Sequence, residues 1–166
     1  MENLLNKETV KRVSQKLKEF DNNLNIIVLE STARTAVDAA KSLNTEVGSI
    51  VKSLLLRTKN SFLLCLISGD KRCSLNKVKK ILNEKDVSMS SADQVKEVTG
   101  FTIGGVSPVG HLNDLNIYID KSLQRFKYVF AAAGHPNTIF KISFTDLQKI
   151  TNGVIEDISE WKIQNL

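Results

Sequence analysis

The chain has 166 residues, of which 42% are hydrophobic and 25% charged, and its formal net charge is +5. We expect one domain over residues 1–166, because this length suits a single core. Neither a stretch of roughly 18 apolar residues nor the apolar core of a signal peptide is present, which predicts a cytoplasmic protein rather than a membrane or secreted one. The positive charge favours a polyanionic partner, with nucleic acid as the natural candidate.

Apolar periodicity predicts helices and strands in alternation along the chain. Thr35 and Ser91 stand where helix N-caps belong, and Gly100 stands where a helix stops. Trp161 is expected to pack into the core. The hairpin-rich order predicts an α+β fold whose mixed, largely antiparallel sheet curls into a barrel with surrounding helices. We expect helices over residues 10–20, 35–43, 74–83, 91–100 and 145–150, and strands over 26–29, 50–57, 62–68, 87–89, 115–119, 128–133 and 138–143.

The spacing of the cysteine, histidine and serine residues excludes several classes of enzyme. Cys65 and Cys73 form no metal-ligand pair and no redox motif, so we expect reduced thiols. His111 and His135 lack the spacing of a zinc hydrolase. No serine stands in a Gly-x-Ser-x-Gly elbow, so a Ser-His-Asp triad has no support. We therefore expect no metal and no other cofactor.

Lys52 is the first candidate functional residue, because it interrupts an apolar run over residues 50–56 that is typical of a buried strand. An ammonium on a core strand loses hydration, which an anion, a carbonyl cluster or a cavity wall must replace. Strand alternation could instead point the amine into water, with its stem along apolar surface, and this is the commoner arrangement for a lone lysine.

Two glycine-containing turns are the next candidates. The loop over residues 103–111 reads Ile-Gly-Gly-Val-Ser-Pro-Val-Gly-His, and its backbone N–H groups could face an anion or a carbonyl oxygen. It matches neither a P-loop nor a dinucleotide fingerprint. The second turn, over residues 131–138, places His135 and Asn137 beside small residues, as a ligand pocket would require. Both turns are equally compatible with purely structural connections between strands.

Basic residues gather between residues 71 and 85, and a solvated lysine face of this kind often serves solubility alone. The cluster supports phosphate contact without proving it. The candidate RNA-binding residues are Lys71, Arg72, Lys77 and Lys80.

In order and spacing, these segments resemble the YbaK/EbsC family of free-standing aminoacyl-tRNA deacylases, which is related to the editing domain of bacterial prolyl-tRNA synthetases. The resemblance begins near residue 31 and is carried by residues 47–54, 68–72, 99–111 and 132–137. It implies a single editing-type domain that removes wrongly attached amino acids from tRNA. The implied substrate is tRNA(Pro) carrying a small non-cognate residue, and the implied partners are the acceptor end of that tRNA and prolyl-tRNA synthetase.

The resemblance also assigns roles to residues. The functional lysine of the family falls on Lys52, and its Gly-x-x-x-Pro loop falls on residues 104–108. We hypothesise that Lys52 holds the terminal phosphate or the ester oxygens, that loop N–H groups orient the carbonyl and the attacking water, and that the vicinal ribose hydroxyl transfers the proton. The expected catalytic residues are Lys52, Gly104, Gly105, Ser107 and Pro108, and the expected substrate-binding residues are Thr32, His111, Gly134 and His135.

Two alternatives to a tRNA deacylase stay open from the sequence. One is a catalytically silent module of the same fold that binds tRNA or nucleotides without turnover. The other is a hydrolase of small esters or amides that uses the same pocket. Loss of ester hydrolysis on Lys52→Ala separates the first alternative from an enzyme, and the rate on simple amino acid esters tests the second.

Overall fold

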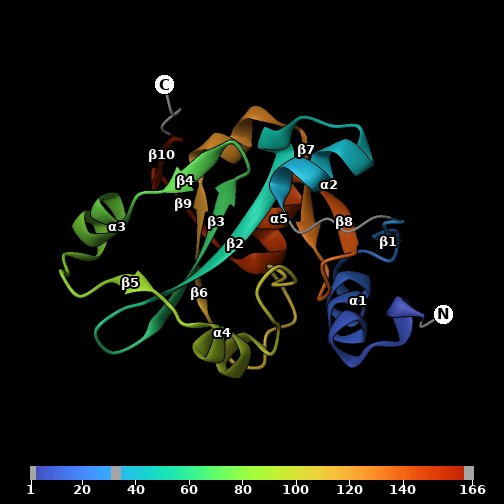
Figure 1. Cartoon of the computed structure of the whole chain (residues 1–166), viewed down its shortest axis with the longest axis horizontal. Coiled ribbons are helices and arrows are strands. Elements are labelled where there is room, and N and C mark those ends of the chain that lie inside the picture. Colours follow the sequence, from blue (N-terminus) through green and yellow to red (C-terminus); the bar gives the residue numbers. More distant parts are fainter. Residues whose placement is uncertain (1–2, 31–34, 163–166) are drawn as a thin grey trace.

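The computed structural model describes residues 3–30 and 35–162, and its centre is one mixed sheet (Figure 1). The strand order is β1-β8-β7-β2-β3-β6-β9, β5 pairs with β2, and β4 and β10 form a separate two-stranded ribbon. The strands are β1 (Ile26–Val28), β2 (Ile50–Arg57), β3 (Phe62–Ser68), β4 (Lys71–Cys73), β5 (Ser88–Met89), β6 (Asn116–Asp120), β7 (Tyr128–Ala132), β8 (Thr138–Ser143), β9 (Val154–Glu156) and β10 (Ser159–Trp161). The helices are α1 (Glu8–Phe20), α2 (Ala36–Leu43), α3 (Leu75–Leu82), α4 (Ala92–Thr99) and α5 (Phe144–Thr151), with 3-10 turns η1 (Leu4–Asn6), η2 (Val47–Ser49) and η3 (Lys121–Arg125).

The sheet is open, so the predicted barrel is wrong. Strand β2 pairs antiparallel with β3 and β5 but parallel with β7, and β3–β6 and β6–β9 are also parallel. A barrel requires hydrogen bonds between the first and last strands of the sheet. Here β1 pairs with β8 and β9 pairs with β6, and Figure 1 shows these two end strands, β1 and β9, well apart. The mixed α+β character is confirmed.

Local capping chemistry explains where the helices begin and end. The Thr35 hydroxyl accepts a hydrogen bond from the Asp38 N–H at 3.1 Å at the start of α2, and Ser91 forms a complete capping box with Gln94 at the start of α4. Gly100 ends α4 with a φ of +81°, a conformation that glycine adopts without strain. The predicted helices are confirmed to within a few residues. None of the helices in the described ranges is long and apolar enough to cross a membrane.

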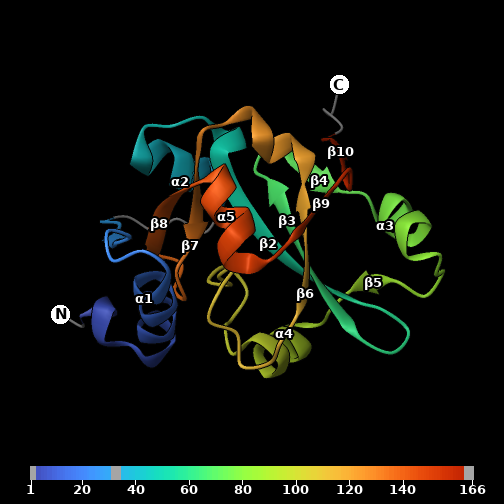
Figure 2. The same ribbon diagram turned by 180° about the vertical axis from the view of Figure 1, so that it is seen from behind.

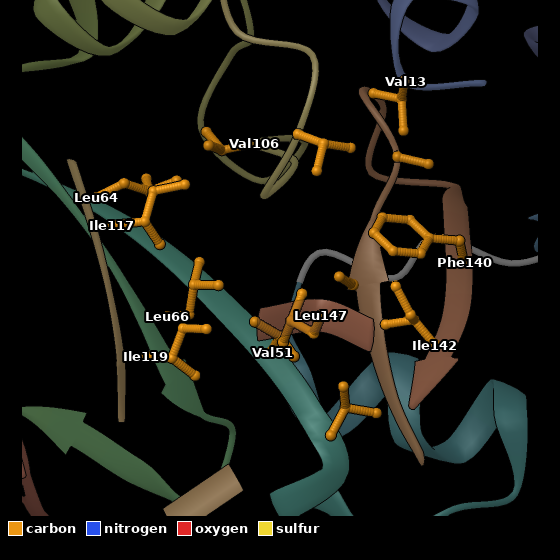
Figure 3. Close-up of a cluster of buried hydrophobic side chains, with 14 of the residues drawn as sticks. Val13, Val51, Leu64, Leu66, Val106, Ile117, Ile119, Phe140, Ile142 and Leu147 are labelled. Carbon is orange, nitrogen blue, oxygen red and sulfur yellow. The ribbon is translucent and has the colours of Figure 1, made fainter. Parts of the chain in front are cut away.

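Strand alternation on β2 divides the core between two faces of the sheet. Val51 and Leu55 face the cluster that includes α1, α5 and the glycine loop (residues 103–111). Figure 3 shows Val51 beside Leu147 of α5, and Val106 of the glycine loop belongs to the same cluster. Leu56 faces the opposite way, into the cluster beside α3. Figures 1 and 2 place α2 and α5 on opposite sides of β2.

The β4–β10 ribbon was not predicted, and it corrects the expectation for Trp161. Trp161 pairs with Lys71 across the ribbon and is 61% exposed, so it does not pack into the core. The Lys71 ammonium lies 4.3 Å from the centre of its ring and the Arg125 guanidinium carbon lies 5.4 Å from it. Cation–π contacts of this kind hold an aromatic ring at the surface.

Candidate active site

A cavity of about 410 Å³ lies beside β2, between α2, the glycine loop and the β7–β8 turn. It forms where β2 changes partners. Val51 of β2 still pairs with Ala131 of β7, whereas Leu56 already pairs with Met89 of β5. Between these two pairings the edge of β2 has no partner strand in the described part of the chain, and residues 50–55 all line the cavity. The cavity therefore lies at a gap in the sheet, and consecutive residues of β2 line it.

Lys52 lies at this gap, is half-buried and lines the cavity. Its Nζ donates a hydrogen bond to the Lys71 carbonyl oxygen. The pKa of Lys52 is lowered from 10.5 to about 8. Burial is the largest cause, and the nearby charge of Lys162 is the second. At neutral pH the amine is still mainly protonated. One N–H is used by Lys71, which leaves two donors for a ligand.

The glycine loop and the β7–β8 turn pack directly against each other at the cavity. Gly104 lines the cavity with a φ of +94°, where a side chain would be strained. A Cβ on Gly105 would lie 3.0 Å from both the backbone N and the Cα of His135, so a side chain there would crowd the backbone of the β7–β8 turn. Pro136 of the same turn also lines the cavity. The structure thus brings together Lys52 and two segments that the sequence singled out.

Ser107, Pro108 and His111 belong to the glycine loop but do not line this cavity. Ser107 is fully buried, and its hydroxyl accepts a hydrogen bond from the Val109 N–H at 3.1 Å. The His111 Nε2 lies 2.6 Å from the Ser107 carbonyl oxygen, and burial lowers the pKa of His111, so the neutral ring donates this bond. Pro108 and His111 line a second cavity near α1 and α5. These contacts stabilise the conformation of the glycine loop rather than form part of the cavity.

Of the remaining predicted substrate-binding residues, Gly134 and His135 are not among the described residues that line this cavity. The Asn137 N–H donates to His135 Nδ1 at 3.0 Å, which orients the imidazole within the turn. Gly134 is buried with a φ of +98°, and a Cβ there would lie 2.7 Å from the Thr9 carbonyl oxygen of α1. Thr32 lies outside the described residues.

The predicted RNA-binding residues lie together on β4 and α3. Lys71 contacts the Trp161 ring, and Arg72 forms an ion pair with Glu160 at 2.8 Å. Lys77 forms an ion pair with Asp157 at 3.1 Å, whereas Lys80 is exposed on α3. The carboxylates beside Arg72 and Lys77 offset much of the positive charge that the sequence pattern indicated.

Several residues of the cavity were not predicted from the sequence, among them Lys162, Ser53 and Ser90. Lys162 reaches the wall because β10 pairs with β4, a contact without a local sequence signal. Ser53 and Ser90 also line the cavity, and serines in these strands form no pattern that would distinguish them. Among the residues that the structure describes, no three His, Cys, Asp or Glu side chains are grouped as metal ligands.

Comparison with known proteins decides the family. Residues 30–150 match the aminoacyl-tRNA editing domain. The chain belongs to this family. A crystal structure of a "putative trans-editing enzyme for prolyl tRNA synthetase" matches this editing domain with a TM-score of 0.88 and 34% identity, over 93% of this chain and 98% of that one. The expected relation to the YbaK/EbsC deacylases is confirmed by these matches.

Curated relatives include both free-standing proteins and parts of larger ones. YwhH of Bacillus subtilis is 28% identical over 86% of this chain and 91% of its own length. The "Putative Cys-tRNA(Pro)/Cys-tRNA(Cys) deacylase EbsC" of Enterococcus faecalis is 26% identical over 75% of this chain and 77% of its own. The proline–tRNA ligase of Thermosipho africanus is 32% identical over half of this chain but only 15% of the ligase.

Proposed function

We propose that this editing domain acts in trans as a deacylase that hydrolyses the ester of mischarged tRNA, with tRNA(Pro) carrying a small non-cognate amino acid as its substrate. The observation that carries the proposal is the single cavity that joins Lys52, the open edge of β2 and the glycine loop. The relatives named for editing and for Cys-tRNA deacylation support it. In this proposal the enzyme works in the cytoplasm on errors of prolyl-tRNA synthetase.

The two lysines of the cavity would bind the anionic end of the RNA. Lys52 offers two N–H donors and a positive charge, and Lys162 adds a second charge at the wall. The terminal phosphate or the ester oxygens of an aminoacyl-adenosine would meet these donors. Lys71, beside Trp161 on the ribbon, lies where the rest of the acceptor end would pass, and its contacts would weaken as salt rises.

The apolar wall would select a small side chain. Val95, Val106 and Ala132 line the cavity together with aliphatic residues of α2 and β2. A cavity of about 410 Å³ must hold the terminal ribose as well as the amino acid, so it leaves little room beyond a small residue. A missing or extra methylene in such a pocket changes binding by about 1–3 kcal/mol.

The chemistry of the ester demands little more than positioning. An aminoacyl ester is already activated, so water needs orientation and the developing oxyanion needs donors. Backbone N–H groups near Gly104 and the ammonium of Lys52 would supply those donors. The described residues that line the cavity include no Asp, Glu or His, and the vicinal ribose hydroxyl would therefore relay the proton from water to the leaving oxygen.

The deciding experiment measures deacylation of tRNA(Pro) charged with alanine, cysteine, serine, threonine or proline. We expect hydrolysis of one or two non-cognate species and a loss of about 100- to 1,000-fold on Lys52→Ala, the range for removing an oxyanion donor. Lys149→Ala is the matched control, because Lys149 is exposed on α5, away from the cavity.

The alternatives give different results in the same assay. Binding of charged tRNA without turnover of any species would identify a silent binding module. Hydrolysis of free amino acid methyl esters at the rate of the charged tRNA would identify a small-ester hydrolase. Full activity of Lys52→Ala would overturn the role of this lysine.

A further inference from the structure

Two serines of the cavity wall have side-chain hydroxyls with no hydrogen-bond partner among the residues that the structure describes. The Oγ atoms of Ser53 and Ser90 are buried, and both residues line the cavity beside Lys52. Leaving a buried hydroxyl unsatisfied costs about 1–3 kcal/mol. Native proteins pair such groups unless the group has another use. Two unpaired hydroxyls in one ligand-sized cavity therefore indicate a binding role.

The strand register places both side chains on the same face of β2 and β5. The Ser90 N–H donates to the Leu55 carbonyl oxygen at 3.1 Å, so Ser90 lies opposite Leu55. Ser53 precedes Leu55 by two residues and shares its face. Ser53 and Ser90 are thus diagonal neighbours, with Cβ atoms roughly 7 Å apart. One small polar group of a ligand can lie between them.

The gap in the sheet lets the Ser53 side chain turn toward a ligand. Val51 pairs with Ala131 and the Leu55 carbonyl is taken by Ser90, but the edge at Ser53 has no partner strand among the described residues. Rotation about χ1 between staggered positions moves a serine hydroxyl without moving the backbone. Both hydroxyls are covered in this structure, so this rotation is the step that binding requires.

We propose that Ser53 and Ser90 form a polar subsite for the side-chain hydroxyl of the aminoacyl group, which makes seryl or threonyl esters the substrate class. This rests on the deacylase function proposed above. A serine or threonine side chain would pair with both hydroxyls, whereas alanine would leave them unsatisfied. Val95 and Val106 line the rest of the cavity with apolar surface. A site with buried hydrogen-bonding groups discriminates against a ligand that lacks the matching group.

The test uses stable amide analogues, in which serine or alanine is joined to 3′-amino-3′-deoxyadenosine, with affinity measured by calorimetry. We expect the seryl analogue to bind about 10- to 100-fold more tightly, as one or two neutral hydrogen bonds would give. Ser53→Ala and Ser90→Ala each weaken the seryl analogue and leave the alanyl analogue unchanged, so the ratio approaches one. Ser61→Ala, in the exposed β2–β3 turn, is the control and keeps the ratio.

A second readout protects the test against misfolding. Because neither hydroxyl has a partner in the described part of the chain, both alanine variants should melt at the wild-type temperature or above it. Equal affinity of the two analogues for the wild type, or equal weakening of both in the variants, overturns the subsite. If alanyl-tRNA(Pro) is nevertheless hydrolysed, the deacylase function stands and only the serine subsite is overturned. If no charged tRNA is hydrolysed and neither analogue binds, both proposals fail.

Discussion

Two groups of buried polar side chains differ in how completely they are hydrogen-bonded. Asp120, at the end of β6, is fully buried, yet its carboxylate accepts four hydrogen bonds. The donors are the N–H and hydroxyl of Ser122, the Ile158 N–H at 2.8 Å and the Ser159 hydroxyl at 2.7 Å. At the cavity, Lys52 donates one hydrogen bond, and the Ser53 hydroxyl makes none within residues 3–30 and 35–162.

This difference is the one expected between a structural polar cluster and a binding site. The Asp120 carboxylate has its hydrogen bonds filled, and it joins β6 to the segment that enters β10. In the function proposed above, the cavity groups keep donors and acceptors free for a ligand, at some cost to stability, as is common where a site is organised before binding. The number of hydrogen bonds that each polar group makes, more than its burial, therefore distinguishes the Asp120 cluster from the cavity groups.

The largest expected effect on stability is that of Asp120→Asn. The new amide nitrogen faces hydroxyl and N–H donors and the charge is lost, so we expect a loss of about 2–4 kcal/mol in the free energy of unfolding. Urea denaturation measures it, with Asp93→Asn on the exposed side of α4 as control. A loss no greater than that of the control would show that the Asp120 cluster does not hold the fold.

Lys52→Met should have a smaller effect of opposite sign. The pKa of Lys52 is about 8 in the folded state, below its ordinary value of 10.5. The charged amine therefore destabilises the folded state relative to the unfolded state at every pH below 8. We expect a gain of about 1 kcal/mol at pH 7 after allowance for solvent screening of the half-exposed amine.

The stability gained by Lys52→Met should shrink as the pH rises from 8 to 10.5. In this range the Lys52 amine of the wild type is already neutral in the folded state but still protonated in the unfolded state. Unfolding at pH 7 and pH 10 tests both points. A destabilised Met variant at pH 7 would place Lys52 with the structural group.

The smallest expected effect concerns Lys162→Gln. The charge of Lys162 helps to lower the pKa of Lys52, so its removal should move that pKa upward from about 8. Titration of the Lys52 Cε resonance in ¹³C-lysine-labelled protein measures the change, and Lys149→Gln is the control. An unchanged midpoint would mean that Lys162 does not act on the cavity.

Local chemistry made much of the fold predictable. The Thr35 and Ser91 caps and the hairpin over residues 50–68 follow from neighbouring residues, and all are confirmed. Barrel closure depended on pairing between distant edge strands, which no local pattern specifies. Trp161 was expected in the core because aromatic residues are usually buried, but two cations hold it at the surface.

The candidate site was predictable only in part. Lys52 and Gly104 stood out, because a charge in an apolar strand and paired glycines are unusual, and the structure brings both to one cavity. Their catalytic roles remain predictions. Ser53 and Ser90 gave no signal, since an unpaired hydroxyl is visible only once every neighbour is known. Lys162 depended on the β4–β10 pairing for the same reason.

The change of partner along β2 also orders the events of folding. The β2–β3 hairpin closes across a short turn, whereas the pairing of Val51 with Ala131 joins residues roughly 80 positions apart. Loop closure over such a span is entropically costly, and parallel pairing between distant strands forms slowly. The hairpin can therefore exist before β7 docks, and the cavity cannot. Under the function proposed above, catalytic competence is accordingly expected to be the last property that the folding chain acquires and the first that it loses on unfolding.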